Sequence, residues 1–186
     1  MTKPQTLTNT PTGTIIRPRR SIHVVQGEYA VSADPEAMLT TVLGSCVATC
    51  IFDEQVGVGG MNHFLLPGEE GQNGNVVYGV NAMELLINGL LKSGARRANL
   101  KAKLFGGARM ISIGSDIGDR NIEFGRRFLN DEGIECVGGS LGGTRARRIQ
   151  FWPTGRARQK QLSDDVKPVE VQPEPRGKAD DDVEFF

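Results

Sequence analysis

Cys46 and His63 are the two side chains of this sequence whose types could carry nucleophilic chemistry together. They lie in the stretch 39–67, LTTVLGSCVATCIFDEQVGVGGMNHFLLP, which holds two of the three cysteines of the chain and one of its two histidines. A thiolate attacks a carbonyl carbon far better than a thiol does, and a neighbouring imidazole can take the thiol proton and later protonate a departing amine. The pair therefore predicts hydrolysis of an amide through a thioester.

The residues between Cys46 and His63 predict a β-hairpin that would bring the pair together. VATCIF and VGVGGMNHFLL have the composition of two strands, and DEQVG lies between them as a turn. A turn about Glu54 and Gln55 would place Cys46 directly opposite His63, with Cα atoms ~4.5 to 5.5 Å apart. A slip of one residue would break this pairing, and DEQVG is not diagnostic of a two-residue turn.

The residues just before Cys46 suggest how such a site would be completed. Gly44 allows a sharp backbone turn, so that the peptide N–H groups of Ser45 or Cys46 could stabilise a tetrahedral oxyanion. Thr40 and Thr41 carry hydroxyls that can accept a hydrogen bond from the histidine ring. From the residues alone, either threonine could orient His63.

A structural interpretation competes with the catalytic one, because free cysteine is among the most buried residue types. Cys50 and Cys136 are expected in the core on that ground, and His23 has no partner at ligand spacing, which favours a structural role. Ser45 is a weaker nucleophile candidate because LGSCV lacks the G-x-S-x-G pattern. Residue types alone leave Cys46 as either a nucleophile or a buried thiol.

Strand-like and helix-like segments alternate along the chain, which predicts an α/β or α+β layered domain. Residues 81–94 place five apolar side chains on one helical face, with Asn81 as a capping residue and Gly94 at the end. A second amphipathic helix is expected over residues 119–133, closed by Gly133. The glycine clusters VGVGG, LFGGARM and VGGSLGG indicate sharp turns and close backbone approaches, and none matches a nucleotide-binding loop.

Length and composition set the frame for this domain. The 186 residues suit one domain, and 22 basic residues balance 22 acidic ones, so no global charge favours nucleic acid or an anionic membrane. No apolar run approaches the roughly 20 residues of a membrane span, and an odd number of cysteines without C-x-x-C favours a reducing, cytoplasmic setting. We expect a flexible arm at 1–19, a folded domain at 20–160 and a disordered acidic, proline-containing tail at 161–186.

Several separated motifs in this order resemble the chemoreceptor glutamine deamidase (CheD) family. They are TTVLGSC, GVGGMNHFLLP, LFGGARM, IGDRNIEF and SLGGTRARRIQFWPTG, and they cover about residues 25–158. The resemblance implies a three-layer sandwich of mixed β-sheets with two main helices. It also implies a cysteine-type triad that converts glutamine side chains of methyl-accepting chemotaxis receptors to glutamate with release of ammonia. Cys46 then matches the nucleophile, His63 the general base and acid, and Thr40 the family threonine.

The resemblance also implies partners. Receptor cytoplasmic domains would be the protein substrate, and a CheC-type phosphatase of phosphorylated CheY would bind in organisms that have one. No metal or organic cofactor is expected, because the reaction needs only an activated thiolate, an oxyanion site and water. A non-catalytic module of the same fold, docking on the phosphatase or a receptor, is the rival interpretation.

A basic stretch near the end of the expected domain is a candidate surface for such a partner. RARRIQFWPTGRARQK carries six cations and no acid, and Arg145, Arg147 and Arg148 are its first three. A solvated strand face is the commonest reason for such a run, and nucleic-acid binding is a second option. Steering of the Glu- and Gln-rich helices of a receptor toward the site is the third, and it fits the resemblance.

Overall fold

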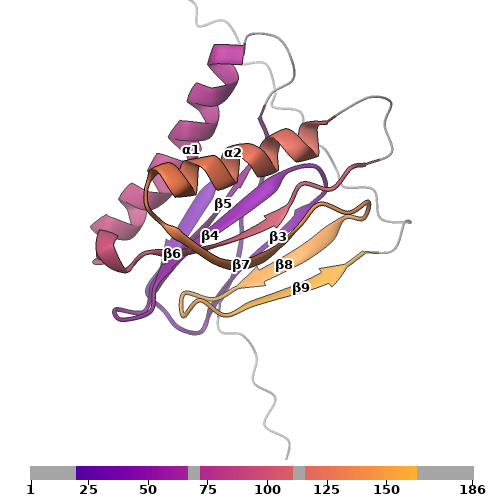
Figure 1. The fold of residues 1–186 in the computed structure, drawn as a ribbon. Coiled ribbons are helices and arrows are strands. Elements are labelled where there is room, and N and C mark those ends of the chain that lie inside the picture. Colours follow the sequence, from indigo (N-terminus) through magenta and orange to yellow (C-terminus); the bar gives the residue numbers. More distant parts are fainter. Residues whose placement is uncertain (1–19, 67–71, 111–115, 163–186) are drawn as a thin grey trace, which may run out of the picture.

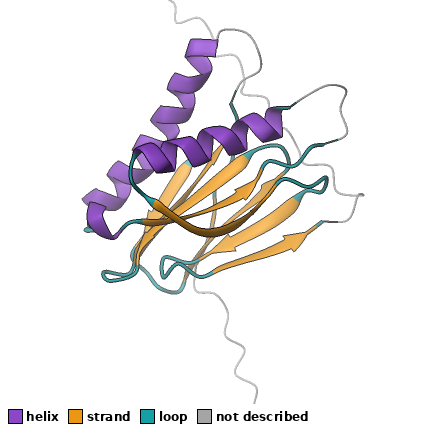
Figure 2. Cartoon of the chain, viewed as in Figure 1, coloured by secondary structure: helices purple, strands orange, loops and turns teal. Residues whose placement is uncertain are grey.

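Two helices, a five-stranded sheet and a four-stranded sheet are stacked in three layers, as the computed structural model shows (Figure 1). The structure describes residues 20–66, 72–110 and 116–162, and the side chains of 72–76 are not described. Figure 2 shows both helices on one side of the strands. The helices are α1 (Gln72–Lys92), α2 (Ile117–Asp131) and the 3-10 turn η1 (Arg97–Asn99), and the strands are β1 (Arg20–His23), β2 (Tyr29–Ser32), β3 (Ala37–Leu43), β4 (Val47–Asp53), β5 (Val58–Phe64), β6 (Lys101–Gly106), β7 (Glu135–Leu141), β8 (Arg147–Phe151) and β9 (Ala157–Gln161). The predicted three-layer α+β sandwich is confirmed.

The middle layer is the sheet with strand order β2-β5-β4-β6-β7, and the outer layer is the sheet with order β1-β3-β8-β9. Both sheets are mixed, since β1 pairs with β3 and β6 pairs with β7 in parallel, while the other pairs are antiparallel. Strands β4 and β5 are buried at every position because both of their faces are covered. The hairpin that carries the candidate site is therefore the centre of the molecule.

Two hydrophobic clusters hold the layers together. The cluster between the helices and the middle sheet contains Val47, Phe64 and the apolar stripe of α1. The cluster between the two sheets contains Leu43, Ala48 and Met61, and Cys46 packs against it. Alternation along β4 and β5 thus assigns each residue of the hairpin to one of two cores.

The ends of both helices follow the glycine signals. Gly94 has a φ of +99° and Gly133 a φ of +66°, and the next residue in each case returns its N–H to a carbonyl in the last helical turn, from Ala95 to Leu90 and from Ile134 to Leu129. The helix starts were harder to predict. Asn81 is not a cap, because α1 begins at Gln72 and runs through it.

The β4–β5 register differs by two residues from the predicted one, which was wrong. The observed pairs join Asp53 to Val58 and Ala48 to His63, so a four-residue loop replaces the expected two-residue turn. The Asp53 carboxylate causes the longer loop by accepting a hydrogen bond from the N–H of Gln55 at 2.9 Å, and the Asp53 carbonyl accepts the N–H of Gly57 at 3.0 Å. A slip of two residues preserves the face of every side chain, so Cys46 lies diagonal to His63 instead of opposite it.

Other expectations differ from the structure at the sheet edges. Strands β3 and β9 were not predicted. Cys50 is fully buried as expected, whereas Cys136 is exposed because β7 is an edge strand whose first five residues are all exposed. The predicted arm at 1–19 and nearly all of the predicted tail at 161–186 lie outside the described residues. Neither helix in the described part of the chain combines the length and the apolar character that a membrane crossing requires.

Candidate active site

His63 is a buried imidazole in which one ring nitrogen has hydrogen-bond partners and the other has none among the described residues. Its Nδ1 lies 2.9 Å from the hydroxyl oxygen of Thr41 and 3.4 Å from the carbonyl oxygen of Val24. A carbonyl can only accept, so this contact assigns the ring proton to Nδ1 and the lone pair to Nε2. Among the described residues, Nε2 has no hydrogen-bond partner, although it is buried. The ring is set up to accept a proton at Nε2.

Burial also fixes the charge of His63. It lowers the pKa of the imidazole to about 4, against which the hydrogen bond to the Val24 carbonyl acts only weakly. The ring is therefore neutral at pH 7, so it is a base and not an imidazolium. Such a base takes the proton during the attack on a carbonyl.

The threonine that contacts His63 is Thr41 and not Thr40. Thr41 shares the inward face of β3 with Leu39 and Leu43, which belong to the cluster between the sheets, so its hydroxyl reaches the ring across that layer. The hydroxyl of Thr40 points to the other face of β3 and donates to the carbonyl of Ile149 at 2.7 Å. The structure thus brings Cys46, His63 and Thr41 to one layer, while Thr40 ties β3 to β8.

Cys46 lies in the short link between β3 and β4, at the open end of the hairpin. Its partly buried thiol donates to the side-chain oxygen of Gln26 at 3.4 Å. Burial raises the pKa of the Tyr78 hydroxyl, and the negative charge that Cys46 can carry raises it further. Since diagonal neighbours in a sheet have Cα atoms ~7 to 8 Å apart, the side chains of Cys46 and His63 are within reach of each other.

Three hydrogen bonds fix the carbonyls of the link that carries Cys46. The N–H of Ala108 donates to the carbonyl of Gly44 at 2.8 Å, and the N–H of Gly107 donates to the carbonyl of Cys46 at 2.8 Å. The side chain of Asn121 donates to the carbonyl of Ser45 at 3.0 Å. Because the C=O and N–H of a trans peptide point in opposite directions, the N–H groups of Ser45 and Cys46 are turned away from these partners.

Gly106 is required where this link crosses the end of β6. Its φ is +111°, a backbone conformation that residues other than glycine rarely adopt. A Cβ at this position would overlap the carbonyl oxygen of Cys46. The predicted close backbone approach at LFGGARM is thus confirmed, and it lies directly behind the candidate nucleophile.

Asn121 joins the two strands of the hairpin at the point where their ladder stops. Continuing the register beyond Val47 and Phe64 would pair Ser45 with Leu66. Instead of meeting directly, these two backbones bind the two ends of one amide, since Oδ1 of Asn121 accepts the N–H of Leu66 at 2.8 Å and Nδ2 donates to Ser45 at 3.0 Å. The fully buried side chain of Asn121 is thus inserted between the strands next to Cys46.

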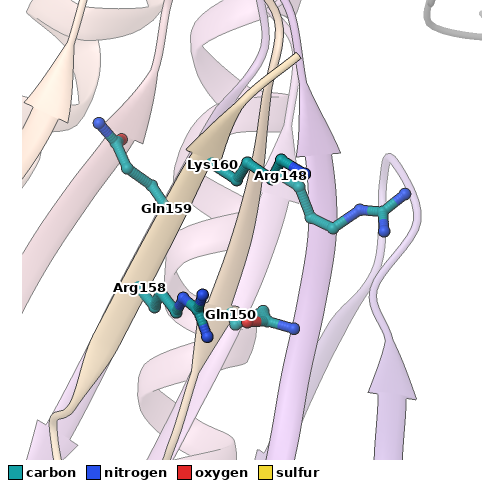
Figure 3. Close-up of a pocket in the computed structure, with 5 residues that line it drawn as sticks. All are labelled: Arg148, Gln150, Arg158, Gln159 and Lys160. Carbon is teal, nitrogen blue, oxygen red and sulfur yellow. The ribbon is translucent and has the colours of Figure 1, made fainter.

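The three arginines proposed as a substrate surface do not form one group. Arg147 is 2% exposed and donates to the backbone carbonyls of Ser140 and Gly142, which makes it a structural residue of the β7–β8 connection. Arg145 and Arg148 are exposed. Arg148 belongs to a cationic surface on the outer face of β8 and β9 that also contains Arg158 and Lys160, around a shallow hollow (Figure 3).

Three residues near the candidate site were missed in the sequence, namely Gln26, Tyr78 and Asn121. Thr41 was named there as an alternative to Thr40. Only Asn121 carried a usable signal, since it is a polar residue in the apolar stripe of α2, three residues before Phe124 and seven before Phe128. No group of three or more metal-ligating side chains occurs in the stretches that the structure describes.

Comparisons with known proteins identify relatives over most of the chain. A family model described as CheD chemotactic sensory transduction matches residues 65–161. A protein of Caulobacter sp. (strain K31) named Probable chemoreceptor glutamine deamidase CheD is 55% identical over 158 residues, which are 83% of this chain and 84% of that protein. Proteins of the same name from Acidiphilium cryptum (strain JF-5) and Agrobacterium fabrum are 57% and 50% identical, over 84% and 90% of this chain and 85% and 97% of theirs.

The solved structures with a similar fold are more distant. A Neisseria meningitidis protein assigned to the family-model DUF152 aligns with a TM-score of 0.44 and 12% identity, over 67% of this chain and 63% of that chain.

Proposed function

Because the chain belongs to the CheD family, we propose that it is a protein-glutamine deamidase that hydrolyses glutamine side chains of chemotaxis receptors to glutamate. The single observation that carries the mechanism is the idle, buried Nε2 of neutral His63, on the side of the hairpin where Cys46 lies. A buried nitrogen without a partner costs stability, so its retention indicates a function. The curated relatives named above are called chemoreceptor glutamine deamidases, which supplies the substrate class.

The first half of the reaction transfers the substrate acyl group to sulfur. Nε2 of His63 takes the thiol proton as Sγ of Cys46 attacks the side-chain carbonyl carbon of the glutamine. The negative charge that develops on the carbonyl oxygen is stabilised by the N–H groups of Ser45 and Cys46, which the pinned carbonyls of the link orient. His63 then protonates the amide nitrogen, ammonia leaves, and a thioester remains on Cys46.

The second half restores the enzyme. Nε2 of His63 takes a proton from water, the hydroxide adds to the thioester carbon, and the C–S bond breaks as sulfur recovers that proton from His63. The product leaves as the carboxylic acid of glutamate, which loses its remaining proton to solvent. Thr41 holds the ring through Nδ1 throughout both halves. In this proposal Thr41 orients His63, and Thr40 supports the strand from the other face. The steps require no redox change or further group transfer, so thiol, imidazole and water are sufficient.

The exposed cationic surface of Arg148, Arg158 and Lys160 is the part of the proposal that concerns substrate capture. These side chains lie on β8 and β9, and the Arg148 end of β8 pairs with the end of β3 that leads to Gly44 and Cys46. Receptor helices rich in Glu and Gln would be attracted to this surface, with the salt dependence of exposed charges. Replacing Arg148 and Arg158 by Gln should raise KM at low salt and leave kcat unchanged, whereas unchanged KM would contradict the role.

The direct test is intact-mass spectrometry of a receptor cytoplasmic fragment incubated with the wild-type protein, with Cys46→Ala and with Cys50→Ala. The proposal predicts a gain of about one dalton per modified glutamine with the wild-type protein and with Cys50→Ala, and none with Cys46→Ala. No gain with any folded protein would instead support the non-catalytic docking module. A CheC-type phosphatase partner remains a prediction from the family resemblance, and a cytoplasmic location remains a prediction from the composition of the sequence.

A further inference from the structure

Gln26 presents a glutamine side chain to the very thiol that is proposed to attack glutamine side chains. The thiol of Cys46 donates to Oε1 of Gln26 at 3.4 Å. The Gln26 side chain is exposed on its other sides and lies in the turn between β1 and β2. The molecule therefore places at Cys46 the same functional group that the proposed substrate would bring.

The position of Gln26 is set by the backbone of His63. The N–H of Gly27 donates to the carbonyl of His63 at 2.8 Å, and the N–H of His63 donates to the carbonyl of Glu28 at 3.1 Å. The turn itself is closed by the N–H of Glu28, which donates to the carbonyl of Val25 at 3.1 Å. The strand that carries the base thus also holds the Gln26 turn beside the nucleophile.

The conformation of Gly27 adds a second constraint on the turn. Its φ of +86° suits glycine, and a Cβ there would lie 3.1 Å from the hydroxyl of Tyr78. The negative charge that Cys46 can carry also contributes to the raised pKa of this Tyr78 hydroxyl, after burial. The turn therefore lies against Tyr78 of α1, while its Gln26 side chain contacts the thiol.

We propose that Gln26 is a built-in competitor, whose amide occupies in the free protein the place that the amide of a substrate glutamine must take beside Cys46. This inference rests on the proposed function and concerns regulation of the same site. A substrate must displace Gln26 before it can react, so the contact lowers the apparent affinity by the fraction of molecules in which it is made. The exposed side chain of Gln26 can swing into solvent without disturbing the core.

The contact has the geometry of a competitor and not of a substrate. A hydrogen bond places the donor in front of a lone pair of the amide oxygen, whereas nucleophilic attack requires sulfur above the carbonyl carbon. The hydrogen bond also keeps the proton on sulfur, because a thiolate could no longer donate to Oε1. Gln26 therefore favours the resting thiol over the reactive thiolate.

The test compares Gln26→Ala and Gln26→Glu with the wild-type protein in a reaction that needs no receptor, the alkylation of Cys46 by iodoacetamide. The matched control is Gln55→Ala, because Gln55 is a turn glutamine at the far end of the hairpin whose amide oxygen accepts from Asn99 at 3.1 Å. Loss of one hydrogen bond of this kind corresponds to about a two- to tenfold change. Gln26→Ala should therefore alkylate about two to ten times faster, with its pH midpoint shifted downward.

Gln26→Glu should alkylate more slowly than wild type, because a carboxylate beside the sulfur disfavours the thiolate. Gln55→Ala should behave as the wild-type protein does. Equal alkylation rates in all four proteins would overturn the inference.

Receptor kinetics separate competition from assistance. With a receptor fragment, Gln26→Ala should lower KM by about the same factor of two to ten and leave kcat unchanged. A higher KM or a lower kcat would show that Gln26 binds the substrate, which contradicts competition. Conversion of Gln26 itself to glutamate in the wild-type protein but not in Cys46→Ala, read from the mass of its peptide, would also contradict it.

Failure of the proposed function remains distinguishable from failure of this inference. If the wild-type protein modifies no receptor, the deamidase proposal fails, while the alkylation rates still report whether the Gln26 amide covers the thiol.

Discussion

The two ends of the β4–β5 hairpin each bury a titratable side chain, but they differ in how completely that side chain is hydrogen-bonded. At the loop end, Asp53 is fully buried, and its carboxylate accepts hydrogen bonds from the N–H groups of Gln55 and Arg96 and from the side chain of Asn99. At the open end, His63 is held through one nitrogen, and its other nitrogen has no partner among the described residues. A side chain whose hydrogen-bonding groups all have partners stabilises the turn, whereas a side chain with one unpaired nitrogen retains a group that can react.

The two side chains also differ in charge, because Asp53 is ionised and His63 is neutral. Burial of Asp53 raises the pKa of its carboxyl, but the hydrogen bonds from Arg96, Gln55, Asn99 and Val56 together outweigh this and lower it, so the charged form is stable. Burial lowers the pKa of His63 to about 4, and the hydrogen bond to the Val24 carbonyl offsets this only weakly, so the neutral form is stable. The loop end of the hairpin therefore holds a charged carboxylate, and the open end holds a neutral imidazole that can accept a proton.

The largest expected effect is a loss of stability on mild acidification that comes from the open end. The unfolded chain binds a proton at His63 near pH 6.5 and the folded chain only near pH 4, so acid favours unfolding between these values. The free energy of unfolding should fall by about 3 kcal/mol across this window. Urea unfolding of the wild-type protein and of His63→Gln at pH 7 and pH 4 measures it.

The loop end supplies the contrast for this experiment. The pKa of Asp53 is lowered below its ordinary 3.8, so its contribution is present above that value and is lost only as the pH falls further. Asp53→Asn should therefore leave the change between pH 6.5 and pH 4 intact, whereas His63→Gln should remove it. If Asp53→Asn removed the loss of stability between pH 6.5 and pH 4 and His63→Gln left it intact, the assignment of this loss to His63 would be wrong.

The next largest effect is expected for Gly106→Ala, which pushes a methyl group into the carbonyl of Cys46. Misplacing the nucleophile by about 1 Å costs on the order of 100-fold in rate, so kcat should fall by about that factor. Gly57→Ala is the matched control at the loop end, because Gly57 also has a positive φ, of +72°, but nothing within 4 Å of an added Cβ. Receptor deamidation rates decide, and an equal loss in both variants would mean that backbone strain alone explains the effect.

A smaller effect is expected for Asn121→Ala, which removes the amide between Ser45 and Leu66. We expect kcat to fall by about 10- to 100-fold with little change in KM, because the link that carries Cys46 loses an anchor. Asn62→Ala is the control, since Asn62 is equally buried and also bridges two backbones, from Thr49 to Ala82, but on the helix side. Both variants should lose about 1 to 3 kcal/mol of stability. Only Asn121→Ala should lose kcat.

The smallest effect is expected for Thr41→Val, which keeps the shape of the side chain and removes the hydrogen bond to His63. Loss of orientation without loss of the base should lower kcat on the order of tenfold. Thr40→Val should lower thermal stability and leave kcat near the wild-type value, since its hydroxyl binds the Ile149 carbonyl. If Thr40→Val slows deamidation more than Thr41→Val, the assignment drawn from the structure is wrong.

Local sequence signals were enough for the parts of the fold that local chemistry decides. Gly94 and Gly133 end their helices because glycine adopts positive φ there at little cost, and the apolar stripe of residues 83–91 faces the core because its period is helical. Cys46 and His63 lie on the same face despite the error in register, because the error was an even number of residues.

The remaining parts depend on contacts that no local pattern encodes. Thr40 and Thr41 are both buried although they lie on opposite faces of β3, so alternation could not decide which one meets His63. Asn121 reaches Ser45 from a helix far along the chain. The burial of Arg147 depends on carbonyls of the neighbouring strand and loop, and nothing in its own basic stretch indicates them.

The most direct test of the central claim, that the open end activates Cys46 through His63, is the rate of iodoacetamide alkylation at neutral pH, read peptide by peptide. Buried Cys50 and exposed Cys136 serve as internal controls in the same protein. The account predicts that Cys46 reacts fastest in the wild-type protein and at least about tenfold more slowly in His63→Ala, with Cys136 unchanged. Equal reactivity of Cys46 in the two folded proteins would contradict it.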